Sequence, residues 1–213
     1  MADMRAFREA VTAWAAGGPG EPARELAARL PVRTAVLLEG LSDAAAVDAL
    51  TERRGLDLEG AGVCVLPMGG AMSVGRFARL LGPSPGLGLR LTGLCDVGER
   101  RFYARALDGA TAGAERRQRF FVCAADLEDE LTRALGVARV EELVRAEGDL
   151  RALQTFLRQP AQQGRTAQQQ LRRFFGTKKG RKIHYGRVLV EALEPDRVPA
   201  PLDDLFDDLL TSI

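Results

Sequence analysis

The sequence predicts an α/β fold in which a four-stranded parallel sheet is flanked by helices and followed by an all-helical C-terminal extension. Four short apolar runs each precede a helical segment, so strand and helix alternate four times. This alternation is typical of a parallel sheet with right-handed crossovers. From about Val137 onward, only helical patterns occur. The 213 residues, 46% hydrophobic and 28% charged, are enough to bury one full core.

Residues 1–31 are expected to form an N-terminal helical segment. Apolar side chains recur at helical spacing within Met1–Ala16, and a glycine- and proline-rich run then ends that helix. A second, short helix covers Pro22–Leu30 and ends at Pro31. No chemical motif is visible in this segment.

The α/β core is expected over residues 32–136. Its strands are nearly continuous apolar runs, as in strands buried on both faces: Ala35–Leu38, Gly62–Leu66, Leu89–Cys95 and Phe120–Cys123. The helices that follow them are Ala44–Arg53, Ser73–Leu81, Arg100–Leu107 and one that Asp126 caps. Residues 108–118 are small and are expected to form a loop.

The C-terminal extension covers residues 137–213. Its expected helices are Val140–Glu147, Leu150–Leu157, Gln168–Phe175, Lys182–Leu193 and Leu202–Leu210, with breaks at Gly164, Gly176-Thr177 and Gly180.

Charge is unevenly distributed in this extension, although the whole chain has a net charge of only +1. Residues 151–190, called here the basic band, contain ten Arg and Lys and no acid, whereas residues 191–213 contain seven acids against Arg197 alone. The basic band predicts contact with phosphates and a strong salt dependence of nucleic-acid binding. The alternative is that the acidic tail, Asp203–Asp208, folds back and neutralises the band.

The three cysteines, Cys64, Cys95 and Cys123, each lie in an apolar strand-like run. Their spacing matches no zinc or redox motif, so we expect reduced, buried side chains. No signal peptide or transmembrane span is visible, which favours a cytoplasmic protein without a membrane partner.

Acidic residues follow three of the four strands, at the edge where open α/β sheets bind ligands. Glu39 and Asp43 flank a turn at Gly40, Asp96 ends the third strand, and Glu128 opens the helix after the fourth. Converging carboxylates repel one another unless a cation is bound, and oxygen-only ligands suit Mg²⁺ or Mn²⁺. Such a site serves phosphoryl chemistry. The alternative is that these acids are only helix caps and solvated strand ends.

The residues resemble a TOPRIM domain, in particular the TOPRIM nuclease portion of the OLD (overcoming lysogenisation defect) family. Glu39-Gly40-x-x-Asp43 after an apolar strand, a later strand ending in Asp96, and a helix that starts Leu127-Glu128 carry the resemblance. It covers roughly residues 32–190 and implies a TOPRIM-like core and a Mg²⁺-dependent nuclease that acts on DNA.

The resemblance also implies roles for individual residues. Glu39 would be a general base or metal ligand, and Asp43, Asp96 and Glu128 would be metal ligands. The phosphate-facing lysine would come from the cluster Lys178–Lys182, and we choose Lys182 because it is expected to begin a helix after Gly180. The residues expected to contact nucleic acid are Arg172, Arg173, Lys178, Lys179, Arg181 and Lys182.

Two departures from the family pattern stand out. TOPRIM domains typically have Asp-x-Asp at the second motif, whereas this chain has Asp96-Val97-Gly98, so the number of metal ions stays open. Glu99 is placed to substitute, although the sequence does not fix its direction. OLD nucleases also join this domain to an ATPase, but no G-x-x-x-x-G-K-[ST] motif occurs here. Any ATPase would therefore be a separate chain or be absent.

The sequence thus predicts a metal-dependent phosphodiesterase that acts on nucleic acid, with a DNA endonuclease of the TOPRIM/OLD type as the specific expectation. One alternative is a non-catalytic nucleic-acid-binding module that works with a separate ATPase or nuclease. Another is a receiver domain that is phosphorylated on Asp96, but the acidic pair and the closing lysine that it needs are missing. Assembly as a homodimer stays open.

Overall fold

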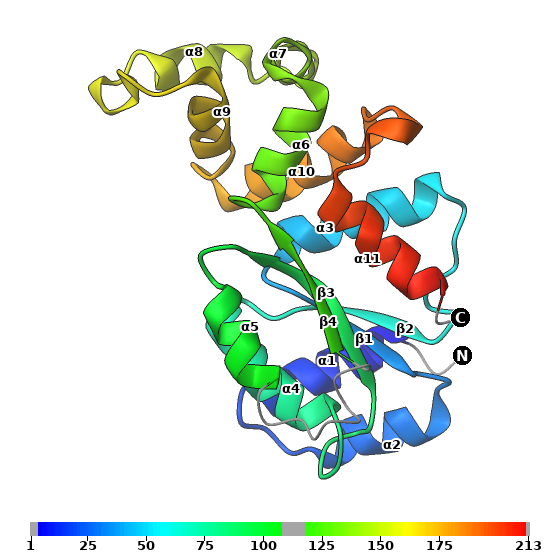
Figure 1. Ribbon diagram of the computed structural model, residues 1–213. Coiled ribbons are helices and arrows are strands. Elements are labelled where there is room, and N and C mark those ends of the chain that lie inside the picture. The colour runs from blue at the N-terminus through cyan, green and yellow to red at the C-terminus, as the bar shows by residue number, and fades with distance from the viewer. Residues whose placement is uncertain (1–3, 108–117, 212–213) are drawn as a thin grey trace.

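The computed structural model describes residues 4–107 and 118–211 (Figure 1). The expected loop at residues 108–118 therefore lies outside the described residues, apart from Gln118. The four strands form one parallel sheet in the order β2-β1-β3-β4. They are β1 Thr34–Leu38, β2 Val63–Pro67, β3 Arg90–Asp96 and β4 Gln118–Cys123. The predicted four-stranded parallel sheet is confirmed.

Strand β1 lies in the middle of the sheet and is buried along its whole length. Leu38 pairs with Pro67 on one side, and Leu37 pairs with Gly93 on the other. At Gly93, where φ is +156°, a Cβ would lie 2.0 Å from the carbonyl oxygen of Leu37, so only glycine fits this approach of β3 to β1. Because all strands are parallel and paired in register, their carboxyl ends meet at one edge.

Two helical layers cover the two faces of the sheet, which explains why β1 is apolar from Ala35 to Leu38 (Figure 1). Ala35 and Leu37 face one layer, and Val36 and Leu38 face the other, as the alternation of side chains along a strand requires. The first layer consists of α1 Met4–Ala15, α2 Glu21–Arg29, the short helix η1 Ala71–Ser73, α4 Val74–Leu81 and α5 Arg100–Leu107. The second is built on α3 Leu41–Arg53, α10 Lys179–Glu191 and α11 Ala200–Leu210.

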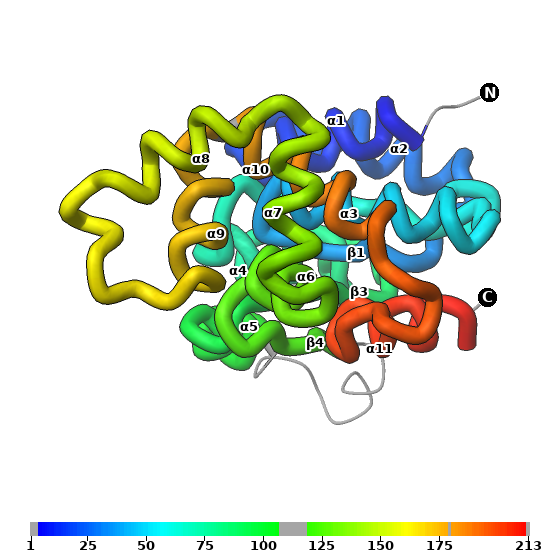
Figure 2. The backbone as a smooth tube through the Cα atoms, turned by 90° about the horizontal axis from the view of Figure 1, so that it is seen from above, coloured from blue at the N-terminus to red at the C-terminus, as the bar shows by residue number. Residues whose placement is uncertain are grey.

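The C-terminal extension is helical, as predicted. Besides α10 and α11 it contains α7 Val137–Ala146, α8 Leu150–Leu157 and α9 Ala167–Phe175, with one-turn helices at Pro160–Gln162 and Pro195–Arg197, and α6 Leu127–Leu135 directly precedes it. Helices α8 and α9 extend beyond the sheet on one side (Figure 2). The expected break at Gly180 is wrong, because α10 begins at Lys179 and contains this glycine. A glycine in the first turn interrupts little, since the first N–H groups of a helix lack intrahelical partners anyway.

Helices α6, α7, α8 and α9 form what we call the helical lobe. Helices α10 and α11 follow this lobe in the chain, pack on the sheet and share its core. Helix α10 packs so closely on α3 that a Cβ at Gly186 would lie 2.5 Å from the carbonyl oxygen of Ser42. Helix α11 places Asp208 against the sheet, where the buried carboxylate pairs with Arg90 and accepts a hydrogen bond of 2.9 Å from the Thr92 hydroxyl. The close approach at Ser42 holds α10 beside the carboxyl end of β1, and Asp208 holds α11 against the amino-terminal half of β3.

The cysteines are buried and unpaired, as predicted, and burial raises the pKa of the Cys64 and Cys95 thiols to about 11. Within residues 4–107 and 118–211, the structure contains no helix with the length and apolar character of a bilayer span.

Candidate metal centre and its cleft

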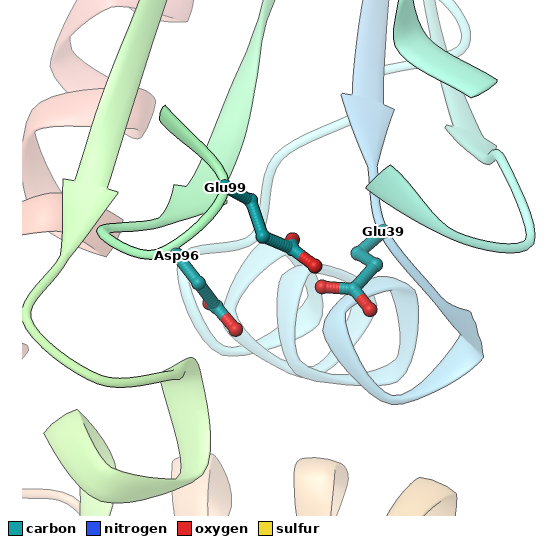
Figure 3. A group of neighbouring side chains, drawn as sticks. All are labelled: Glu39, Asp96 and Glu99. Atoms are coloured by element: carbon teal, nitrogen blue, oxygen red, sulfur yellow. The ribbon is translucent and has the colours of Figure 1, made fainter. Parts of the chain in front are cut away.

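Three carboxylates meet at the carboxyl edge of the sheet. Glu39 follows β1, Asp96 ends β3, and Glu99 lies in the turn after β3, and their side chains point toward one another (Figure 3). One oxygen from each lies within 4.8 Å of the others. Two strands that are neighbours in the sheet therefore bring together acids far apart in the sequence. We call Glu39, Asp96 and Glu99 the acid cluster.

The turn after β3 explains why Glu99 joins this cluster. The backbone N–H of Glu99 donates to the carbonyl oxygen of Asp96 at 2.9 Å, and that of Val97 donates to Cys123 at 2.9 Å. These bonds fold the chain back over the strand end. The hydrogen bonds leave Val97 and Gly98 exposed and direct Glu99 toward Glu39. The acid that the second motif lacks at Gly98 is thus present one residue later.

Burial and neighbouring carboxylates raise the pKa values of Asp96 and Glu99 in the absence of a cation. Burial, reinforced by the charges of Asp126, Glu39 and Asp43, raises the pKa of Asp96 to about 8. Burial and the contact with Glu39 raise the pKa of Glu99 to about 7. The Oε2 atom of Glu99 is buried and has no hydrogen-bond partner among the residues that the structure describes. Buried acids without partners favour a protonated form or a shared cation.

Asp43 lies next to the cluster, in the first turn of α3. Its Oδ2 accepts the backbone N–H of Gly40 at 2.9 Å, which caps the helix. Burial and the charge of Glu128 raise the pKa of Asp43 to about 7, and Glu39 adds to this shift. Asp43 can therefore cap helix α3 and also belong to the acidic site. The oxygens of Asp43 are not among the three that converge within 4.8 Å.

Glu128 is paired with Lys182 and does not converge with the other acids. Glu128 is only 2% exposed, and its Oε2 lies 3.3 Å from the Nζ of Lys182, without the alignment of a hydrogen bond. Burial disfavours the charged form of Lys182, but Glu128, Asp43 and Asp126 outweigh this effect and raise its pKa. Burial raises the pKa of Glu128, and Lys182 opposes that shift. The pair holds an ammonium group beside the acid cluster.

A cleft of about 880 Å³ opens beside these residues. Its walls are the turn Glu39–Asp43, the backbone of Gly69 and Gly70, Lys182 and Ile183 on α10, and α1, with the small residues Ala13 on this helix and Ala16 just after it. The N-terminal helix, in which the sequence revealed no chemistry, thus forms one side of the cleft. Nothing in its residue pattern predicts this role, because it follows from where α1 packs.

The basic band has mixed surroundings. Arg172 pairs with Asp126 at 2.5 Å, and Arg181 makes a two-pronged contact with Asp149. Arg173 and Lys178 are exposed and form no salt bridge within residues 4–107 and 118–211. The side chain of Lys179 lies outside the described part of the structure. Part of the band is thus neutralised, and part is free.

The acidic tail does not fold back on the basic band in the described structure. Asp203 pairs with Arg54 on α3, and Asp208 pairs with Arg90 and Arg119 at the sheet. The acids that neutralise part of the band come from elsewhere, namely the starts of α6 and α8 and the helices α3 and α10.

Comparisons with known proteins agree with this architecture. Residues 32–97 match the family model "Overcoming lysogenization defect protein-like, TOPRIM domain", and they run from just before β1 to the turn after Asp96. Two solved structures have the same fold over 85% of this chain. One is the C-terminal region of the Burkholderia pseudomallei OLD protein, with 19% identity, a TM-score of 0.65 and 98% of that chain covered. The other is the C-terminal region of the Xanthomonas campestris pv. campestris OLD protein, with 25% identity, a TM-score of 0.63 and 96% covered.

No curated protein matches the sequence. The predicted resemblance to an OLD-type TOPRIM domain is confirmed: residues 32–97 carry it in sequence, and the fold extends it to the helical lobe. A nuclease-type TOPRIM module is thereby supported in general terms.

Proposed function

We propose that this chain is a TOPRIM nuclease module, a metal-dependent phosphodiesterase that acts on nucleic acid, with DNA as the expected substrate. The observation that carries the proposal is the convergence of Glu39, Asp96 and Glu99 within 4.8 Å at the carboxyl edge of the sheet. The match of residues 32–97 to the OLD-like TOPRIM family supports it. The fold alone would not, because one fold serves many functions.

The donor set fits Mg²⁺ or Mn²⁺. All three groups of the acid cluster are carboxylates, the ligands that hard divalent cations prefer. The buried, unpartnered Oε2 of Glu99 is explained if it faces a cation. Bound there, the ion would supply charge stabilisation for a phosphodiester and activation of water. Asp43 is the further acid that a second ion would use.

The chain's own residues divide the remaining work. Lys182 is cationic, faces the same cleft as Glu39, and is held by Glu128, so it can stabilise negative charge that develops on a phosphate. Asp43, with a pKa raised to about 7, suits proton transfer near neutral pH. Glu39 stands between the cleft and the other two acids, and we assign it as a metal ligand or general base.

The exposed cations of the basic band, such as Arg173 and Lys178, are proposed to contact the phosphate backbone. Residues 1–213 contain no ATP-binding P-loop motif, and a separate ATPase partner stays a prediction. A homodimer and a cytoplasmic location stay predictions. The rival function, a module that binds nucleic acid without cutting it, differs from the proposal only in its chemistry.

A plasmid-nicking assay separates the two. Supercoiled DNA is incubated with the protein and Mg²⁺ or Mn²⁺, and the nicked and linear forms are quantified. The wild type should nick with either metal and not with EDTA. Glu39→Gln should lose about 100-fold or more, since electrostatic groups at a reacting phosphate are worth that much. Glu25→Gln, which removes one exposed carboxylate from α2, is the matched control and should cut like the wild type.

Retained binding without metal-dependent cutting by the wild type would favour the non-catalytic module. Equal cutting by the wild type and Glu39→Gln would point to a contaminant and refute the assignment of the site.

A further inference from the structure

A second cationic surface lies on the opposite face of the sheet from the basic band. Helices α4 and α5 line a groove of about 520 Å³, and its walls include Met72, Arg76, Arg79, Phe102 and Arg105. We call it the arginine groove. Two further arginines, Arg100 and Arg101, begin α5 beside it. None of these arginines belongs to the residues that the sequence predicted to contact nucleic acid.

The charge of this surface is uncompensated. Arg76, Arg79, Arg100, Arg101 and Arg105 are all exposed, and none forms an ion pair within the part of the chain that the structure describes. Between Ala71 and Leu107 the only acids are Asp96 and Glu99, and both belong to the acid cluster. In the basic band, by contrast, Arg172, Arg181, Lys182 and Arg187 each have an acidic partner.

Exposed apolar groups accompany these cations. Met72 is 82% exposed, and Phe102 is half-buried with the guanidinium of Arg101 4.9 Å from its ring centroid. A surface built only for solubility has no need of a thioether and a ring between arginines. Cations interleaved with flat or apolar groups are typical of surfaces that bind nucleic acid, where phosphates and sugars are contacted together.

One wall of the arginine groove is α5, the helix that begins directly after Glu99 of the acid cluster. Arg100 directly follows Glu99, and along α5, which lies beside α4 (Figure 1), Arg101 and Arg105 are one turn apart. One helical turn of four residues rises about 6 Å, close to two base steps of about 3.4 Å each along DNA. A strand that ran along α5 from a phosphate at the acid cluster would therefore meet cations at about the axial spacing of every second phosphate.

We propose that the arginine groove binds the phosphate backbone of a nucleic acid on one side of the acid cluster, while the free cations of the helical lobe bind it on the other. The inference rests on the proposed function, and it names a substrate contact that the function alone does not require. A polyanion held at both sides of the reacting phosphate is fixed in position there, which is the usual purpose of phosphate contacts. Charge complementarity selects this occupant, since the groove offers cations and no acid.

The salt dependence of binding tests this proposal. The dissociation constant of a fluorescein-labelled 20-bp DNA duplex is measured by fluorescence anisotropy in Ca²⁺ at several NaCl concentrations. The variant Arg79→Gln/Arg105→Gln removes two cations from the groove. Arg29→Gln/Arg33→Gln is the matched control, because both residues are exposed and lie near the amino-terminal start of β1, at the opposite edge of the sheet. Thermal unfolding verifies that both variants fold.

Each lost contact should lower the slope of log affinity against log salt by about 0.9. The groove variant should therefore lose about 1.8 in slope and about sixtyfold in affinity at 0.1 M salt, while the control keeps the wild-type values. A wild-type slope in the groove variant, an equal loss in the control, or no DNA binding by the wild type would each overturn the proposal. Tighter binding of polyglutamate than of DNA, lost in the same variant, would show that the occupant is an acidic peptide.

The nicking assay distinguishes the two failures. If the salt-dependence slope falls in the groove variant but the wild type shows no metal-dependent cutting, the nuclease proposal is refuted and the groove proposal is retained. If cutting depends on Glu39 but the salt-dependence slope of the groove variant is unchanged, only the groove proposal is refuted.

Discussion

Replacing Gly186 with alanine tests how the fold positions Lys182. Gly186 lies in α10 one turn after Lys182, where the helix touches the first turn of α3. An added Cβ would lie 2.5 Å from the carbonyl oxygen of Ser42. Carbon and oxygen atoms normally approach to about 3.3–3.6 Å, so α10 has to retreat by about 1 Å from α3. That movement carries Lys182 away from the acid cluster.

The magnitude follows from two opposing effects. Overpacking a buried contact costs about 1–3 kcal/mol, whereas alanine in place of glycine favours a helix by about 1 kcal/mol. The net loss in the free energy of unfolding should be about 1 kcal/mol, or 2–4 °C in Tm for a chain of this size. The effect on cleavage should be larger, since a misplacement of about 1 Å at a reacting centre costs up to about 100-fold.

The matched control is Gly180→Ala in the same helix. No atom lies within 4 Å of a Cβ built at Gly180, so this variant should gain up to about 1 kcal/mol and cut normally. Urea denaturation and plasmid nicking measure both effects. Mn²⁺ affinity should stay at the wild-type value in both variants, because no residue of the acid cluster lies on α10. A Gly186→Ala protein that is as stable and active as Gly180→Ala would refute the reasoning.

Three further predictions concern other parts of the molecule. Metal-free protein should lose stability as the pH rises from about 4 to 8. Folding raises the pKa of Asp96 from 3.8 to about 8, so in this range the folded state holds a proton that the unfolded state releases. Denaturation at pH 5, 6.5 and 8 measures the stability, and a gain over this range would contradict the prediction. Ala13→Trp should fill the cleft and lower the rate of cleavage tenfold or more (about 1.4 kcal/mol). Ala28→Trp, on the exposed side of α2, should leave the rate unchanged. Equal nicking rates for the two variants would show that the cleft is not used. Asp208→Ala leaves Arg90 without its buried partner and should cost about 3–5 kcal/mol in the free energy of unfolding. Asp207→Ala, at an exposed position of the same helix, should cost less than about 0.5 kcal/mol. Similar Tm values for the two variants would refute this prediction.

The sequence was informative about the sheet because its strands are buried on both faces. A run such as Ala35–Leu38 has no amphipathic alternation, and four such runs separated by helices leave few arrangements other than a parallel sheet. The meeting of Glu39 with Asp96 was also predictable, since parallel strands bring their carboxyl ends to one edge.

Other features depend on contacts that periodicity does not encode. The direction of Glu99 is set by the turn in which its N–H bonds to Asp96. The pairing of Lys182 with Glu128 depends on α10 returning from the lobe to the sheet. The continuation of α10 through Gly180 needs no packing contact, because a glycine in the first turn of a helix interrupts few hydrogen bonds.

The sequence pattern does not indicate the arginine groove, for a related reason. Its cations come from two helices separated in the sequence by a loop and a strand, so no continuous run marks them, as one marks the basic band. Whether a cation faces an acid is decided in space. Arg172 and Arg181 belong to the basic band and are neutralised, whereas Arg79 and Arg105 belong to no band and are free in the described structure.

Binding of Mn²⁺, followed by electron paramagnetic resonance at pH 8 as the metal is titrated, examines most directly whether Glu39, Asp96 and Glu99 form a cation site. The wild type should bind the ion with micromolar to submillimolar affinity and release protons as it does so. Glu39→Gln and Asp96→Asn should each weaken binding at least tenfold, while Glu25→Gln should not. If the wild type leaves Mn²⁺ free at millimolar concentration, or if all four proteins bind it equally, these carboxylates are not a metal site.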